Sequence, residues 1–201
     1  MSWIKTINYE SANASLKKIY DRVKGPNNKV DNVLKIHSLR PHSLVGHMAL
    51  YKNVLHNFNN TLPKWYLEAL GTFVSHLNQC DYCFDHHYEG FKRILNDDPK
   101  AEGFRNAVMN GSTKDFFTDQ YFAGCQYAEK LTLHHSTIEK KDIENLKQVG
   151  FTEGEILEIN QVTSYFNYVN RTVVGLGVDT TGDILGLSPN NSDDPNSWNH
   201  S

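Results

Sequence analysis

The sequence predicts an all-α protein folded as one compact helical bundle. Apolar residues recur at three- and four-residue spacing through nearly the whole chain, which is the period of helices that pack on one face. Strand-like alternation between turns is hard to find. No repeat or low-complexity linker divides the 201 residues, a length that is ordinary for a single domain. We therefore expect one helical domain over residues 1–187.

The expected helices of the first half each have a start or a stop signal. Within residues 11–25, small polar residues can cap a helix that Gly25 ends, and a short helix follows over 30–37. Two further helices begin near Pro41 and Pro63, because proline suits the first turn of a helix. The helix after Pro63 has apolar residues around most of its circumference, which indicates that it is buried.

The second half continues the helical pattern up to a polar tail. Thr152 and Glu155 form a capping-box pattern at the start of its last helix. The tail over residues 188–201 is polar and lacks periodicity, so we expect it to be disordered. The expected helices of this half cover 80–97, Asp98 to about Met109, 113–135, 140–150 and 152–177.

The charge balance and the start of the chain argue against a nucleic-acid-binding, exported or membrane-spanning protein. The formal charge of −3 lacks the basic footprint of a nucleic-acid binder. No basic segment followed by an apolar run opens the chain, and no apolar stretch of about 18 residues occurs in it. We therefore expect a cytoplasmic protein without a membrane segment. Structural disulfides are rare in that compartment, so Cys80, Cys83 and Cys125 should be metal-binding, catalytic or inert.

The stretch NQCDYCFDHH places Cys80, Cys83 and His87 on one face at the start of a helix. Unpaired amides and the macrodipole at a helix start stabilise a thiolate and can lower a thiol pKa from ~8.5 to about 7 or below. His87 could take a thiol proton, and a disulfide can form once the turn relaxes slightly. This pattern indicates a redox pair.

Glu68 is the candidate partner of His87. It is a carboxylate in an otherwise apolar helix, 12 residues before Cys80. The short connection around Asn78 and Gln79 should make the two helices antiparallel and bring Glu68 beside the histidine, where a carboxylate would hold the imidazole in one tautomer. We therefore expect a proton relay from Glu68 through His87 to the cysteine pair.

The same four residues resemble a family pattern. Glu, eleven residues, Cys, two residues, Cys, three residues and His is the active-site pattern of the AhpD-like alkylhydroperoxidases, within the carboxymuconolactone decarboxylase superfamily. In this chain the pattern reads Glu68, Cys80, Cys83, His87. The stretch SLRPHSLVGHMALY before the site, with AEKLT and FNYVNR after it, is similar to the peroxidase-related branch of that family. The resemblance covers nearly all of the chain up to the tail.

The resemblance implies an obligate homo-oligomer of AhpD-like bundles that reduces a hydroperoxide without a cofactor, in an antioxidant role. One thiolate would attack the peroxide, the second cysteine would close a disulfide, and an external dithiol or disulfide reductase would reset the pair. Glu68 and His87 would relay protons. We favour Cys83 as the attacking residue because His87 is its i+4 neighbour.

Two positions depart from the family pattern, and two alternatives stay open. Gln79 stands where many relatives carry glycine, and Tyr82 where others carry histidine, so the resemblance implies neither the shape of the turn nor the catalytic efficiency.

The cysteines and a histidine could instead bind zinc in a structural oligomer, with Asp85, His86 or a partner chain as fourth ligand. The other alternative is a decarboxylase acting on a cyclic lactone acid, although such relatives generally lack the cysteine pair.

Other polar residues have plainer expected roles. Cys125 lies among small and apolar neighbours and should be a buried filler rather than a third redox thiol. His86 is expected at the surface, while His47 could approach the site from a neighbouring helix. Asn167 and Arg171 are four residues apart and could form a polar seam, which we expect to serve packing between subunits.

Overall fold

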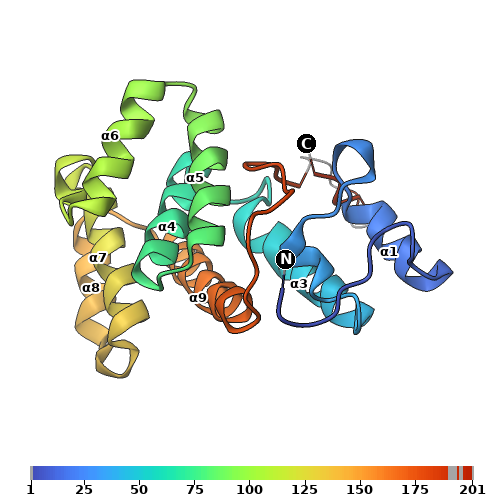
Figure 1. Cartoon of the computed structure of the whole chain (residues 1–201). Coiled ribbons are helices and arrows are strands. Elements are labelled where there is room, and N and C mark those ends of the chain that lie inside the picture. The colour runs from blue at the N-terminus through green and yellow to red at the C-terminus, as the bar shows by residue number, and fades with distance from the viewer. Residues whose placement is uncertain (1, 190–193, 195–196, 201) are drawn as a thin grey trace.

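The computed structural model describes residues 2–189, 194 and 197–200, and these residues form helices without any β-strand (Figure 1). The all-α prediction is therefore confirmed. An isolated antiparallel bridge joins Pro189 to His200. The α-helices are α1 (Ala14–Val23), α2 (Asn32–Lys35), α3 (Pro41–Leu55), α4 (Lys64–Leu77), α5 (Asp81–Leu95), α6 (Asp98–Met109), α7 (Asp119–Leu133), α8 (Lys140–Gln148) and α9 (Glu153–Gly175).

Most helix starts follow the signals that the sequence contains. The side chain of Asn13 accepts a hydrogen bond from the amide of Leu16 at the start of α1. Thr152 and Glu155 form the expected capping box at the start of α9. Both arrangements satisfy amides that the first turn of a helix leaves unpaired. Pro41 is the first residue of α3, where the missing amide hydrogen has no intrahelical partner to lose.

The helix expected over 113–135 is shorter in the structure. Helix α7 begins after Thr118, whose hydroxyl oxygen accepts from the amide of Tyr121 at 3.5 Å. A short 3₁₀ turn precedes it, and Phe117 between the turn and the helix is buried in the core. The apolar spacing before Thr118 therefore reflects packing of a loop, which the helical period does not separate from a helix.

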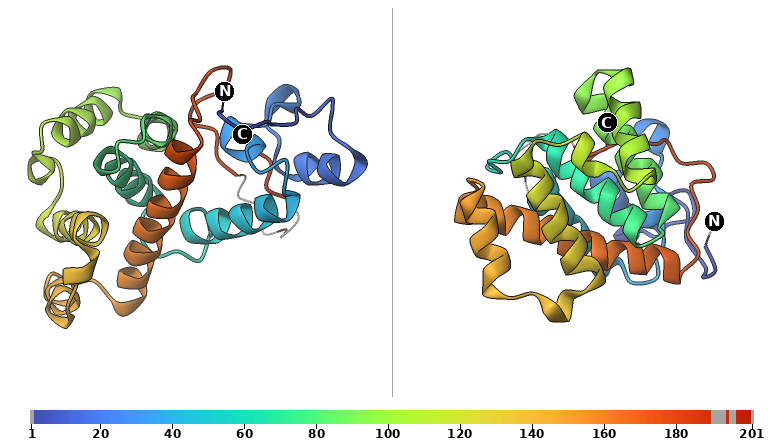
Figure 2. Two further views of the ribbon diagram at one scale, coloured as in Figure 1. Left: turned by 60° about the horizontal axis from the view of Figure 1, so that its bottom comes forward. Right: turned by 90° about the vertical axis from the view of Figure 1, so that its left-hand side faces the viewer.

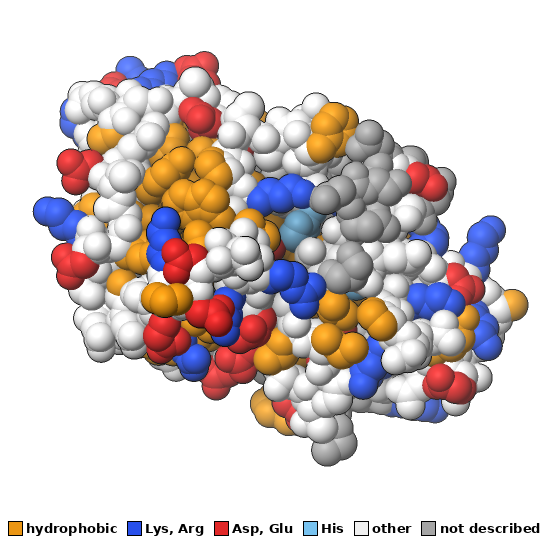
Figure 3. Space-filling view, turned by 90° about the horizontal axis from the view of Figure 1, so that it is seen from above, with side chains coloured by type: hydrophobic (Ala, Val, Ile, Leu, Met, Phe, Trp, Pro, Cys, Tyr) orange, Lys and Arg blue, Asp and Glu red, His pale blue; other side chains and the backbone are white. Residues whose placement is uncertain are grey.

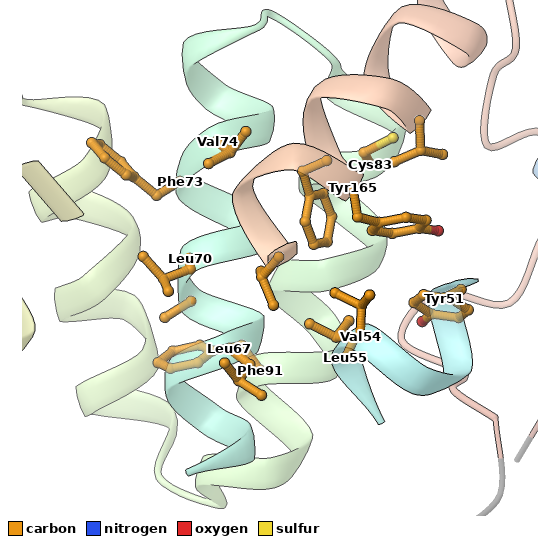
Figure 4. Close-up of a cluster of buried hydrophobic side chains, with 14 of the residues drawn as sticks. Tyr51, Val54, Leu55, Leu67, Leu70, Phe73, Val74, Cys83, Phe91 and Tyr165 are labelled. Carbon is orange, nitrogen blue, oxygen red and sulfur yellow. The ribbon is translucent and has the colours of Figure 1, made fainter. Parts of the chain in front are cut away.

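Helix α4 forms the centre of the core, as its apolar circumference predicted. It packs against α5, α7 and α9. Figure 4 shows Leu67 of α4 beside Phe91 of α5, and Phe73 of α4 on the side away from α9. Gly71 permits a close contact with α9, because the ring of Phe166 fills the space that a Cβ at Gly71 would occupy.

The described C-terminal residues pack beside α1. Helices α1 to α3 lie on one side of the molecule and α4 to α9 on the other, and the segment after α9 runs back between them (Figures 1 and 2). Trp198 is buried there, its amide donates to the carbonyl of Arg22, and His200 is buried as well. These described residues differ from the expected disordered tail, while 190–193, 195–196 and 201 lie outside the described residues.

In the part of the chain that the structure describes, no helix is both long and apolar enough to cross a membrane.

Candidate active site

A tight turn between α4 and α5 brings the cysteine pair back onto the core. Cys80 precedes the first residue of α5, and its amide donates to the carbonyl of Ser75 at 2.9 Å. Gln79 has a φ of 54°, in the left-handed region that favours glycine. Gln79 thus adopts a conformation that suits glycine, at a cost of about 1 kcal/mol.

Cys80 and Cys83 are buried free thiols at the start of α5. The pKa of the Cys80 thiol is lowered, chiefly by a hydrogen bond from the Cys83 side chain and further by the Cys83 amide, which outweigh the opposing effect of burial. Burial raises the pKa of the Cys83 thiol well above its usual value. The pKa values of the two thiols are therefore shifted in opposite directions.

Glu68 and His87 meet as the spacing predicted. The Nδ1 of His87 lies 2.7 Å from Oε2 of Glu68, and the side chains are 13% and 3% exposed. Because a carboxylate accepts, Nδ1 is the protonated ring nitrogen and Nε2 is left able to take up a proton. Glu68 has a second neighbour that the sequence did not predict: Nε2 of His56, the residue after α3, lies 3.6 Å from its Oε1.

Cys83, Glu68 and His87 line the same small cavity, whereas Cys80 does not. The centres of water molecules can occupy only about 40 Å³ of the cavity, which is room for a few waters or a small polar group. Figure 4 shows Cys83 of α5 beside Tyr165 of α9, and the ring centroids of Tyr165 and Tyr51 are 5.5 Å apart. The cavity also contacts His200, so the C-terminal residues form part of its wall.

His47 and His86, which the sequence analysis did not assign to the site, also line this cavity. His47 is 4% exposed, which agrees with its expected approach to the site. The expectation that His86 lies at the surface is wrong, because its side chain is 9% exposed and its ring packs 4.5 Å from that of Tyr82. Helix α5 presents two successive histidines to the interior because the segment after α9 covers its outer side there.

An amide network behind the cysteines was not predicted as part of the site. Asn170 of α9 donates to the hydroxyl of Ser75 at 3.1 Å and accepts from Asn78 at 2.9 Å. Its side chain also hydrogen-bonds both cysteines and lowers the pKa of each. The sequence signal for this network is the FNYVNR stretch, which contains Asn170.

The expected polar seam in the same stretch exists within the chain. Arg171 donates to the side-chain oxygen of Asn167 at 2.7 Å, and the amide nitrogen of Asn167 donates to Thr132 of α7 at 3.0 Å. Asn78 also donates to Asn167, at 3.2 Å. The seam therefore joins α9 to α7 and to the cysteine turn, whereas we expected it to serve contacts between subunits.

Cys125 lies apart from the pair, in α7. It is 1% exposed, and burial raises the pKa of its thiol well above the usual value. Tyr66 is its hydrogen-bonding neighbour. These observations agree with a buried filler.

The described residues contain no group of three His, Cys, Asp or Glu side chains arranged to hold a metal ion. The zinc alternative would need such a group around the cysteines. Within the described residues of this chain, the cysteines and His87 therefore do not form a ready zinc site.

The comparisons with known proteins concern the fold. No protein-family model and no curated protein matches the chain. An uncharacterized peroxidase-related protein from a Silicibacter species is 26% identical with a TM-score of 0.69, over 78% of this chain and 80% of that chain. A peroxidase-related protein from Ralstonia eutropha, described as an alkylhydroperoxidase AhpD core, is 19% identical with a TM-score of 0.75, over 90% and 93%.

A third solved structure extends the range of chemistry found on this fold. The debrominase Bmp8 is 16% identical with a TM-score of 0.64, over 83% of this chain and 86% of that chain. A likeness at such identity concerns the backbone arrangement and leaves substrate and activity open. The chain has the all-helical fold of AhpD-like, peroxidase-related proteins.

Proposed function

We propose that the protein is a thiol-dependent hydroperoxide reductase in which Cys83 attacks the peroxide and Cys80 resolves the product. The observation that carries the proposal is the shared cavity: Cys83, His87 and Glu68 line it together, and Cys80 does not. A buried thiol beside an imidazole that a carboxylate orients is the arrangement of an activated nucleophile.

The proposed reaction begins with the removal of a proton from Cys83. His87 takes it on Nε2, and the resulting thiolate attacks the outer oxygen of ROOH. The O–O bond breaks, Cys83 becomes a sulfenic acid, and the leaving alkoxide recovers the proton from His87 as ROH. The bond between His87 and Glu68 keeps the ring in the tautomer that this exchange needs.

The second step closes the disulfide. The thiolate of Cys80 attacks the sulfur of the Cys83 sulfenic acid, the S–S bond forms, and hydroxide leaves as water after taking up a proton. The lowered pKa of Cys80 supports this role, because the resolving attack requires a thiolate at Cys80. Two thiols have then supplied the two electrons that reduce ROOH to ROH and water, and an external dithiol would restore them.

Single substitutions separate the two cysteine roles. With tert-butyl hydroperoxide, Cys83→Ser should leave no reactive thiol, while Cys80→Ser should stop at a Cys83 sulfenic acid that dimedone traps. Cys125→Ser should react as the unmodified protein does, because its thiol is buried away from the cavity. Full peroxide-dependent oxidation in Cys83→Ser would remove Cys83 from the proposal, and a sulfenic acid at Cys80 would reverse the two roles.

The proposal includes a homo-oligomer. Large apolar side chains are exposed, among them Leu50, Ile94, Met109 and Leu157 at 42–56%. Figure 3 shows a broad area of apolar side chains on the left half of the molecule in that view. A contact between copies would bury such surface. Light scattering of the purified protein should give a mass of at least two chains, and a monomer at micromolar concentration would contradict this part of the proposal.

A further inference from the structure

Tyr82 lies between the two cysteines, and its hydroxyl is held on two sides. It donates to Oδ2 of Asp183 at 2.7 Å and accepts from the amide of Val33 at 3.1 Å. The side chain is buried, and burial together with Asp183 keeps the pKa of the phenol well above its usual value, so it remains a donor. The hydroxyl of Tyr82, the residue between Cys80 and Cys83, is therefore held in place by two hydrogen bonds.

Asp183 is itself fixed in the segment after α9. Its side chain is fully buried, and Oδ2 also accepts from the amide of Asn32 at 2.9 Å. Asn32 in turn donates from its side chain to the carbonyls of Asp179 and Thr181 at 2.9 and 3.1 Å. The hydroxyl of Tyr82 thus joins the first turn of α5 to α2 and to the segment after α9.

This anchoring matters because the first turn of α5 must change when a disulfide forms. In the described structure both cysteines are free thiols, and Cys80 precedes the first residue of α5. A disulfide brings the two sulfurs to about 2.05 Å with a dihedral near 90°. The residues between the cysteines move with them, and a hydroxyl anchored on two separate segments resists that movement.

We propose that Tyr82 and Asp183 form a clamp that stabilises the dithiol and so sets the reduction potential of the Cys80–Cys83 pair. The inference rests on the proposed redox role of the pair and adds a positioning role for two residues outside the relay. Loss of the clamp should favour the disulfide, which makes the potential more negative.

The test is a thiol–disulfide titration that needs no peroxide. The protein is equilibrated at pH 7 with reduced and oxidised dithiothreitol, and the Cys80–Cys83 disulfide is quantified by mass spectrometry. Two protein thiols become a disulfide as oxidised dithiothreitol becomes its dithiol. Tyr82→Phe keeps the ring and removes the hydroxyl. We expect the equilibrium to shift about tenfold toward the protein disulfide, which is about 30 mV for a two-electron couple.

Two further variants distinguish the clamp from a general loss of stability. Asp183→Ala removes the other partner and should shift the equilibrium in the same direction, and the double variant should shift it no further than the larger single effect. Tyr20→Phe is the matched control, since Tyr20 is equally buried and its hydroxyl donates to the carbonyl of Ile7 at 2.7 Å, away from the pair. It should lower the melting temperature without moving the redox equilibrium.

The outcomes separate this inference from the proposed function. An unchanged or less negative potential in Tyr82→Phe and Asp183→Ala, with a normal disulfide in the unmodified protein, would overturn the clamp alone. A shift of equal size in Tyr20→Phe would also overturn it, because the effect would then follow stability. If the unmodified protein forms no Cys80–Cys83 disulfide at any ratio, the clamp and the proposed reductase both fail.

Discussion

The carboxylate of Glu68 occupies a position that only a partnered charge tolerates. It is 2% exposed and lies in the most apolar helix of the molecule, where an unpaired carboxylate would be strongly destabilising. His87 lies at 2.7 Å from one of its oxygens and His56 at 3.6 Å from the other. The residue therefore links the proposed proton relay to the end of α3.

Removal of the charge of Glu68 tests the relay. Glu68→Gln keeps the size of the side chain and can still accept from His87, so the fold should persist. A neutral amide stabilises the imidazolium less, so the rate of cysteine oxidation by tert-butyl hydroperoxide should fall by roughly 100-fold, the lower end of general acid–base contributions. Stopped-flow measurement of disulfide formation gives the rate.

Glu129→Gln serves as control for this variant, because Glu129 is exposed on α7. It should leave the rate unchanged. Equal rates in Glu68→Gln and the unmodified protein would show that the carboxylate is structural only.

The residues of the site were predictable to the extent that they are close in sequence. Glu68, Cys83 and His87 lie on two helices joined by a short turn, so helical spacing alone brings them together. His56 and Asp183 come from segments whose position depends on the packing of the whole chain. Nothing in their local sequence marks them, and a single sequence does not give that packing.

At the scale of helices, the contact between α4 and α9 fixes the wall of the cavity. The tip of the Phe166 ring of α9 lies against Gly71 of α4, and the rings of Phe166 and His87 are nearly perpendicular with centroids 4.6 Å apart. The position of His87 therefore depends on Gly71, which lies three residues after Glu68 in α4. The helix starts could be read from capping residues, whereas this close approach could not, because glycine in a helix has several causes.

Gly71→Ala should disturb both stability and the site. A Cβ there overlaps the Phe166 ring, so the helices must separate, and overpacking of this kind typically costs about 1–3 kcal/mol in the free energy of unfolding. Urea denaturation measures that change. Gly103→Ala in α6 is the matched control, since no atom lies within 4 Å of its added Cβ, and it should be neutral or stabilising by up to about 1 kcal/mol. A stabilised Gly71→Ala would contradict the described packing.

For the molecule as a whole, buried neutral histidines make stability depend on pH. Burial lowers the pKa of His47 to about 3 and of His200 to about 4, and it lowers the pKa of His56 well below its usual value. In the unfolded chain these rings bind protons near pH 6.5. The unfolded state therefore binds more protons than the folded state below that pH, and stability falls as the pH falls.

Carboxyl groups with raised pKa values oppose this effect, chiefly Asp31, whose pKa burial and Asp183 raise to about 6, and also Asp85, whose pKa burial raises. Asp31 makes the folded state more stable as the pH falls, because between about pH 4 and 6 its carboxyl group is protonated in the folded state and ionised in the unfolded state. By pH 4, His47 and His200 each lower the free energy of unfolding by up to about 3 kcal/mol. Asp31 raises it by a similar amount, so the loss from the two histidines is the larger effect. The melting temperature should fall steadily from pH 7 to pH 4.5, and His200→Asn should lessen that fall. A melting temperature that is constant or rises over this range would contradict the described burial.

The central claim is that Cys80 and Cys83 are a peroxide-reducing pair, and mass spectrometry of the reduced protein tests it most directly. One equivalent of tert-butyl hydroperoxide is added, the reaction is stopped by acid after seconds, and the peptide that contains residues 80–87 is mapped. The account predicts a loss of two hydrogens located in a Cys80–Cys83 bridge, with one equivalent of tert-butanol formed. Thiols that remain reduced, or an oxidation located at Cys125, would contradict it.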